Sequence, residues 1–235
     1  MKKRCLRPGL AALLLAVVFA LSACGGAGSV SPADSAGAAA TPTPEPVVAF
    51  PYALEDGALV VQSLFQASVS NPDCGDRMGE NTAAMELKNS SGRFLARADV
   101  TAVLADGTVL RFAAQDIPAD GVVWAFETSN TTLPDGAVCR ELTCTASYED
   151  EAPLLAEQVS VTADGTSVTV QNLTDRDLAG LQIGFHCLFD GDVYYGGIVY
   201  TYPVESLPAG GSASLEVSEC FLGAAQAVRV TQAAE

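Results

Sequence analysis

The chain has 235 residues, of which 28 are Asp or Glu and 12 are Lys or Arg, so its formal net charge is −16. Four of the basic residues lie within the first seven positions, and the rest of the chain carries a net charge near −20. This balance argues against nucleic acid or anionic lipid as a partner of the folded part, since both bind to cationic surfaces. It suits a solvated surface outside the cell, a cationic partner or metal ions.

The first residues of the chain predict export. A positively charged segment that includes Cys5 precedes an unbroken apolar stretch over 10–21. A membrane-spanning helix needs about 18–20 apolar residues, so this shorter stretch is typical of a secretory signal peptide. We therefore expect residues 1–23 to be a signal peptide that is removed together with Cys5.

The apolar stretch ends in Leu21-Ser22-Ala23-Cys24, which resembles the lipobox of bacterial lipoproteins. Two small residues let the chain lie extended in a peptidase groove, and the Cys24 thiol is the atom that takes the diacylglyceryl group. More than one acyl chain, palmitate for example, gives stable anchoring. The alternative is an ordinary cleaved signal with a chance Cys. The resemblance implies a protein held by lipid on Cys24 to the extracytoplasmic face of the cell membrane.

The segment that follows Cys24 offers almost nothing to bury. Residues 24–48 are mostly Gly, Ala, Ser, Thr and Pro, with the sequence TPTPEP at 41–46. Such compositions do not fold, and Pro-rich stretches are stiff and extended. We expect 24–48 to be a disordered tether that lifts a folded part off the membrane.

From about residue 50 onward the sequence predicts strands. Apolar and β-branched runs alternate with turn signals such as Asp-Gly and Pro-Ala-Gly, and only 153–158 has a brief helical pattern. One face of 181–189, as in a half-buried strand, carries Leu181, Ile183, Phe185, Cys187 and Phe189. Strands with one apolar face need a second layer, so we predict an all-β fold of sandwich type.

An internal repeat divides this region. Asn89 aligns with Asn172, Asp106-Gly107 with Asp190-Gly191, and the segment 117–121 with 207–211. The period is too long for a solenoid unit and favours two tandem domains of similar fold. We expect two Ig-like β-sandwich domains, at 50–148 and at 155–235, joined by a linker.

The second copy resembles the FxLYD domain family, small Ig-like sandwiches of microbial surface proteins. The resemblance rests on Asn172, on the segment HCLFDG at 186–191 and on LPAG at 207–210. Phe189 stands where the family has Tyr, and His186 where it has Phe. The first copy keeps only Leu104, Asp106 and Gly107 of the motif. The resemblance implies the fold; it implies no activity, because the motif is structural.

Five cysteines follow Cys24, and outside the cell they can form disulfides. Their number is odd, so at least one must be unpaired or pair between chains. We expect Cys74 to pair with Cys144 or with Cys139. Cys187 and Cys220 are the natural pair of the second domain, although Cys187 faces inward and can equally be a core residue.

The remaining chemistry gives no catalytic or metal site. The only histidine, His186, has no Ser or Cys partner at a known spacing, and its strand position is typical of a surface imidazole. Zinc is disfavoured because the spacing of Cys139 and Cys144 is looser than that of a zinc knuckle. Acidic turns such as Asp175 and Asp177 can supply calcium ligands, but their spacing matches no EF-hand loop. We predict no enzyme activity and no cofactor.

Four tyrosines offer a candidate binding face. Alternate members of such a group share a strand face, and exposed Tyr is common in interfaces. The competing reading is that half of them belong to the core, as we also expect for Trp124 in the first domain. The candidate face consists of Tyr194, Tyr195, Tyr200 and Tyr202.

These predictions combine into an anchored module of the cell envelope that binds an unidentified envelope protein or glycan, or has a structural role. The alternative function is that of an accessory lipoprotein, which captures a ligand or senses one for a transport or envelope system. Neither reading involves nucleic acid.

Overall fold

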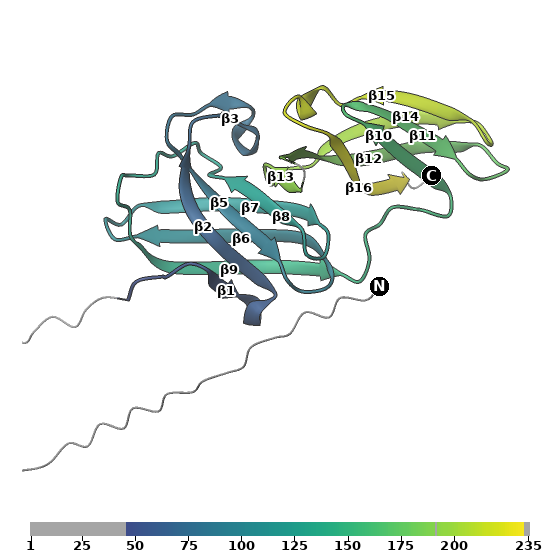
Figure 1. Ribbon diagram of the computed structural model, residues 1–235. Coiled ribbons are helices and arrows are strands. Elements are labelled where there is room, and N and C mark those ends of the chain that lie inside the picture. The colour runs from purple at the N-terminus through teal and green to yellow at the C-terminus, as the bar shows by residue number, and fades with distance from the viewer. Residues whose placement is uncertain (1–45, 191, 233–235) are drawn as a thin grey trace, which may run out of the picture. The chain divides into compact units, whose positions relative to one another are not determined.

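The computed structural model describes residues 46–190 and 192–232, which belong to one compact unit of the chain, 44–235. The predicted signal peptide, Cys24 and the predicted tether up to residue 45 lie outside the described residues. The described chain is all-β, as predicted (Figure 1). Its strands are accompanied by the 3-10 turns η1 (Glu55–Gly57), η2 (Pro72–Cys74) and η3 (Ser218–Cys220).

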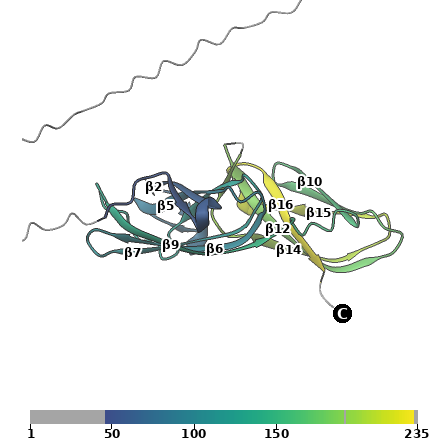
Figure 2. The same ribbon diagram turned by 90° about the horizontal axis from the view of Figure 1, so that it is seen from below.

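The N-terminal half, residues 46–150, has two layers of strands (Figure 2). One layer contains β1 (Tyr52–Leu54), β2 (Leu59–Ala67), β5 (Thr82–Asn89) and β8 (Val122–Phe126). The other contains β6 (Phe94–Leu104), β7 (Val109–Ile117) and β9 (Cys139–Glu149). A small ribbon of β3 (Ser70–Asn71) and β4 (Arg77–Met78) follows β2.

The core of this half lies between the two layers. Its members come from both sheets, and Leu59, Leu87, Leu110 and Ile117 are fully buried. Val48 packs against this core, and its N–H donates to the carbonyl of Cys139 at 2.9 Å. The last residues of the predicted tether therefore already belong to the folded part.

The C-terminal half, residues 153–232, repeats the two-layer pattern. One layer contains β12 (Leu178–Phe189), β13 (Val193–Tyr195), β14 (Tyr200–Leu207) and β16 (Ala225–Gln232). The other contains β10 (Val159–Asp164), β11 (Ser167–Asn172) and β15 (Ser212–Glu216). The expected short helix at 153–158 is instead extended chain with a turn over 156–158, in which Leu154 and Leu155 pack against the core of this half.

The alternation predicted for the long strand β12 is confirmed on its inward face. Four of the five predicted residues, Leu181, Ile183, Phe185 and Cys187, are buried in the core of the C-terminal half, and Phe189 packs half-buried against it. Burying such side chains contributes about 1.5–3 kcal/mol each, so this face alone orients the strand.

The sequence repeat corresponds to a repeated hydrogen-bond motif. In the first copy, the amide nitrogen of Asn89 donates to the carbonyls of Arg93, Ile117 and Pro118 at 2.8–3.0 Å. In the second, the amide nitrogen of Asn172 donates to the carbonyls of Arg176, Leu207 and Pro208 at 2.7–3.0 Å. Both asparagines are buried. Each thus ties the end of one strand to the Pro-containing turn that the repeat conserves between its two copies.

The hairpin turn predicted at Asp106-Gly107 is also present. Gly107 has φ = 87°, and the carboxylate of Asp106 accepts the N–H of Thr108 at 2.9 Å. A positive φ at the second turn residue is the reason why Gly follows Asp in such hairpins. Gly191, the equivalent position of the second copy, lies outside the described residues.

The two halves share one sheet, which the tandem-domain prediction did not anticipate. The order β1-β2-β5-β8-β13-β12-β14 runs from the first half into the second, because β13 pairs with β8 in parallel. The two cores also exchange residues: Tyr194 packs into the first, and Ala84 and Phe126 pack into the second.

Candidate functional site

Polar side chains bind backbone groups across the region where the two halves meet. We call it the junction and define it by η2, β7, β8, β13 and residues 196–198. Val193, Tyr194 and Tyr195 of β13 lie opposite Val122, Val123 and Trp124 of β8. The pairing continues past the strand, because the N–H of Gly196 donates to the carbonyl of Trp124 at 3.0 Å.

Asp73, in η2, lies at the centre of the junction. Its carboxylate accepts the N–H of Phe126 at 2.7 Å, that of Gly197 at 2.8 Å and that of Ile198 at 3.0 Å. Burial raises the pKa of Asp73 to about 6, against the opposing effect of these backbone hydrogen bonds. One side chain of the first half thus satisfies backbone donors of both halves.

Two glycines allow this close approach. A Cβ atom at Gly197 would overlap the carbonyl of Ala113 on β7, and one at Gly196 would overlap the ring of Pro72. The carbonyl of Gly197 in turn accepts the N–H of Gln115 at 2.9 Å. Residues without side chains are therefore needed where the second half touches η2 and β7.

His186 is not the surface imidazole that its strand position predicts. It is fully buried, and its ring lies 4.8 Å from that of Tyr194. Nε2 lies 2.6 Å from the carbonyl of Gln115, so this nitrogen carries the proton and donates. Burial lowers the pKa of His186 to about 4. The expectation was wrong because the first half covers the face of β12 that faces solvent in an isolated sandwich.

An ion pair crosses the same region. Arg229 of β16 binds Asp116 of β7 through two hydrogen bonds, at 2.9 and 2.7 Å, and its guanidinium lies 3.4 Å from Glu149. The guanidinium also lies over the ring of Phe94, 5.8 Å from its centroid. Side chains of β6, β7 and β9 thus hold an arginine of the second half.

A cleft of about 370 Å³ opens beside this ion pair. Both halves contribute to its walls, which combine polar side chains with Ala96, Gly184 and Val199. Its principal polar lining residues are Arg97, Gln115, Asp116, Gln182, Thr201 and Arg229. A hollow of about 460 Å³ lies elsewhere, near residues 47–50 and 133–139. In that hollow the side chain of Gln66 is already bound to the carbonyl of Leu133 and to Asp135.

The predicted tyrosine face does not form. Tyr194 and Tyr195 are only 4% and 8% exposed, and the hydroxyl of Tyr195 donates to the carbonyl of Ser70 at 2.6 Å. Tyr200 and Tyr202 are half-buried, and their hydroxyls donate to Asp76 and Glu219. The prediction is wrong for the first pair because β13 inserts between the halves.

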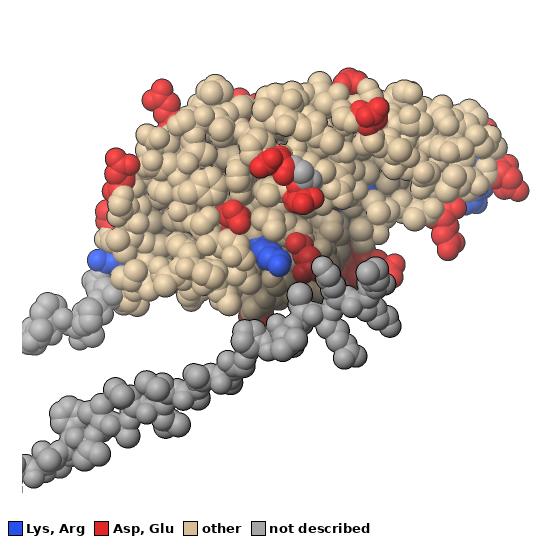
Figure 3. All heavy atoms as spheres, in the orientation of Figure 1, with Lys and Arg blue, Asp and Glu red and all other residues tan. Residues whose placement is uncertain are grey.

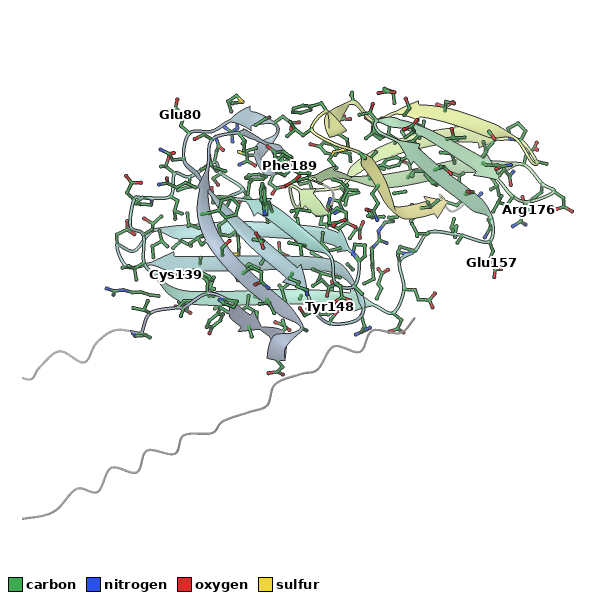
Figure 4. All side chains as sticks on the ribbon, in the orientation of Figure 1. Glu80, Cys139, Tyr148, Glu157, Arg176 and Phe189 are labelled. Carbon is green, nitrogen blue, oxygen red and sulfur yellow. A yellow bond between two sulfur atoms is a disulfide. The ribbon has the colours of Figure 1, made fainter. Side chains whose placement is uncertain are left out.

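Aromatic rings fill the space around β13. Trp124 contacts Phe65 on one side and Phe189 on the other, with ring centroids 5.4 and 5.1 Å apart. Figure 4 shows Phe189 where the strands of the two halves approach each other. Trp124 is therefore half-buried against the second core and not enclosed in the first.

The disulfide predictions have a mixed outcome. Cys187 and Cys220 form a disulfide, which closes η3 onto β12. Cys74 pairs with neither Cys139 nor Cys144, and all three thiols are free. Cys74 lies in η2 beside Arg77. Cys139 and Cys144 lie on β9, which pairs with β6 in the other layer of the first half. Burial raises the pKa of Cys144 to about 12, so this thiol stays protonated.

Sequence reasoning missed Asp73, Asp116 and Arg229. A signal existed for Arg229, because it is a lone cation in the otherwise uncharged strand AQAVRVTQ. Asp73 gave none, since Asp after Pro in a turn is ordinary. No group of three or more His, Cys, Asp or Glu suited to a metal ion occurs among the described residues, and the calcium turns at Asp175 and Asp177 form no such group.

The chain matches no protein-family model and no curated protein. The resemblance to the FxLYD family therefore stays a prediction. Within residues 46–190 and 192–232, no helix is long and apolar enough to cross a membrane.

Proposed function

We propose that this protein is a non-catalytic, lipid-anchored binding or structural module of the cell envelope. In this proposal it consists of two Ig-like, FxLYD-like sandwiches carried on a tether from Cys24. The signal peptide pattern and the lipobox-like segment support export and anchoring at the outer face of the membrane. The matching hydrogen bonds of Asn89 and Asn172 support two related domains, since the same local motif occurs at equivalent positions.

The observation that carries the proposal is the junction. Asp73 binds backbone donors of both halves, β13 extends the sheet of the first half, and Arg229 reaches across to Asp116. Two domains joined only by a linker would move independently. Held in this way, they present one fixed surface to a partner, which is the property that a binding or scaffolding module needs.

The surface charge limits the kind of partner. On the face seen in Figure 3, acidic side chains are spread widely and basic side chains are few. This distribution supports an envelope protein or an uncharged glycan as the partner, and argues against nucleic acid.

Labelling with radioactive palmitate in a bacterial host, followed by membrane fractionation, tests the anchor. We expect label and membrane association for the wild-type chain and no label for Cys24→Ser. Cys5→Ser is the matched control, because Cys5 is discarded with the signal peptide, and it must keep both. Loss of label in Cys5→Ser alone, or label on Cys24→Ser, contradicts the proposal.

The cleft favours a second candidate function. A polar hollow between two domains is a common place for a small ligand. An accessory lipoprotein that captures or senses a ligand for a transport or envelope system uses such a site. The two functions share the anchor and differ in whether a soluble small molecule binds.

A further inference from the structure

The cleft between the halves is opened by irregular backbone on both of its sides. On the first side, Ala96 of β6 lies at a break in the strand register, and Asp116 of β7 has φ = 52°, a left-handed value. On the second side, the register of β12 and β16 shifts between Gly184 and Phe185. Strand irregularities of this kind redirect side chains and are frequent beside binding sites.

The irregularities decide which side chains reach the cleft. The left-handed turn at Asp116 directs its carboxylate to Arg229 of the other half, where only 8% of the Asp116 side chain is exposed. Gly184 lets Val199 pack closely against β12 in the wall of the cleft, because a Cβ atom at Gly184 would lie 2.7 Å from a methyl of Val199. The left-handed backbone at Asp116 and the register shifts, which cost free energy locally, thus bring polar side chains of both halves to one concave surface.

The charges in the cleft are neutralised in pairs. Arg229 is bound to Asp116, and Arg97 is bound to Asp99 at 2.6 and 2.7 Å. In each pair the guanidinium binds its carboxylate through Nε and Nη2, and Nη2 of Arg229 also donates to Glu149 at 3.4 Å. The two N–H groups of Nη1 remain for another acceptor. The cleft therefore offers directed donors whose positive charges are offset by the carboxylates of Asp99, Asp116 and Glu149.

Four neutral side chains complete the lining. Gln115 and Gln182 are half-buried, and Thr201 and Thr231 are exposed. Their side chains make no hydrogen bond within the part of the chain that the structure describes. Two amides and two hydroxyls can both donate and accept, which is the combination that a polyhydroxylated molecule requires.

From these features we propose that the cleft binds an uncharged saccharide of one or two sugar rings. Its volume of about 370 Å³ lies within the range of about 300–1,000 Å³ that is usual for small-ligand sites. The ligand hydroxyls bind the four neutral side chains and the free guanidinium N–H groups. The inference rests on the proposed function as a binding module and names its ligand class.

Charged ligands fit the cleft less well. An anion that takes Arg229 from Asp116 would leave a buried carboxylate without its partner, and one that binds only the N–H groups of Nη1 would lie close to the carboxylates of Asp116 and Glu149. Breaking a buried ion pair in this way is strongly unfavourable. A cation would be repelled by the guanidinium groups of Arg97 and Arg229, which both line the cleft. A neutral polyol requires neither change, since it uses only groups that the existing pairs leave free.

Saturation-transfer-difference NMR on the full lipidated chain, held in dodecylphosphocholine micelles, tests this proposal. The probes are cellobiose, maltose and N,N′-diacetylchitobiose as neutral saccharides, with N-acetylneuraminic acid and glycine as charged comparators. We expect saturable transfer to at least one neutral disaccharide and none to the charged comparators. If no neutral disaccharide shows saturable transfer, or if N-acetylneuraminic acid binds best, the proposal is wrong.

Variants locate the binding. Gln182→Ala and Thr231→Ala each remove one expected hydrogen bond and should weaken binding roughly threefold to tenfold. Gln171→Ala and Thr169→Ala change the same residue types at exposed positions of β11, outside the cleft, and should leave the affinity unchanged. Equal losses in both pairs would place the sugar elsewhere and overturn the assignment.

This result can be separated from that of the anchor. A chain that takes palmitate on Cys24 but binds no neutral sugar contradicts the cleft assignment alone. A chain that binds the sugar but takes no palmitate contradicts the anchor alone.

Discussion

Two titratable side chains, Asp73 and His186, lie where the halves meet, and each contacts backbone groups of the other half. Neither is exposed to solvent as a surface residue would be. Burying these two polar side chains costs desolvation. Their hydrogen bonds offset this cost, because they supply partners to buried backbone groups. At the residue scale, the junction is therefore held by side chains that bind backbone groups across it, while Nδ1 of His186 is buried without a partner among the described residues.

Replacing Asp73 should weaken the whole described part of the chain. Asp73→Ala leaves the N–H groups of Phe126, Gly197 and Ile198 without their acceptor. Each unsatisfied buried donor costs about 1–3 kcal/mol, so we expect a loss of at least about 3 kcal/mol in the free energy of unfolding. Urea unfolding measures it. Asp164→Ala, at an exposed strand end, should change stability by less than about 0.5 kcal/mol. A similar small change for Asp73→Ala would contradict its role.

His186 should make the junction sensitive to acid. Its pKa falls from 6.5 in the unfolded chain to about 4 in the fold, so its contribution is complete above pH 6.5 and is lost as pH falls through 4. One pKa unit corresponds to 1.36 kcal/mol, which gives a loss of about 3 kcal/mol.

The comparison of wild type with His186→Gln isolates this effect. The raised pKa of Asp73 acts in the opposite sense, its contribution being lost as pH rises through about 6, but it is common to both proteins. We expect the stability difference to shift in favour of the variant by about 3 kcal/mol between pH 7 and pH 4. His186 is the only histidine, so a difference that is flat with pH would show that burial does not control this group.

At the element scale, β13 determines how the halves join. It has only three residues, and its parallel pairing with β8 depends on the glycines that follow it. Parallel strands need long connections, and residues 127–192 provide one that passes through several other elements. Such a pairing leaves no periodic mark in the sequence.

A methyl group at Gly197 should weaken the pairing of β13 with β8. Gly197→Ala places a Cβ atom against the backbone of Ala113, which cannot yield as a flexible side chain could. We expect faster hydrogen exchange at the amides of Gln115 and Gly196, which bond across the junction. Gly210→Ala meets no neighbour within 4 Å and strains only its own turn at φ = 64°. Junction amides that exchange equally fast in both variants would argue against this role of Gly197.

The sequence predicted local features better than the contacts between halves. Alternation along β12 and the Asp-Gly turn at Gly107 are local features. The sequence repeat also aligned Asn89 with Asn172, which make equivalent hydrogen bonds in the two halves. The exposure of His186 and Tyr194 could not be predicted, because each depends on a surface that is distant in the sequence. The candidate cleft has the same origin, since its two walls come from different copies of the repeat.

At the scale of the whole molecule, the two halves should behave as one body. The shared sheet, the exchange of core residues and the ion pair of Arg229 with Asp116 all support this. A fixed relation between the halves is also what keeps the cleft walls in register. Independent domains would open and close it without defined geometry.

Nuclear magnetic relaxation of backbone 15N in the unlipidated Cys24→Ser chain tests this claim most directly. We predict that the strand amides of both halves, from β1 to β16, fit one rotational diffusion tensor. Two tensors, one for 46–150 and another for 153–232, would show that the halves tumble separately and would contradict the account.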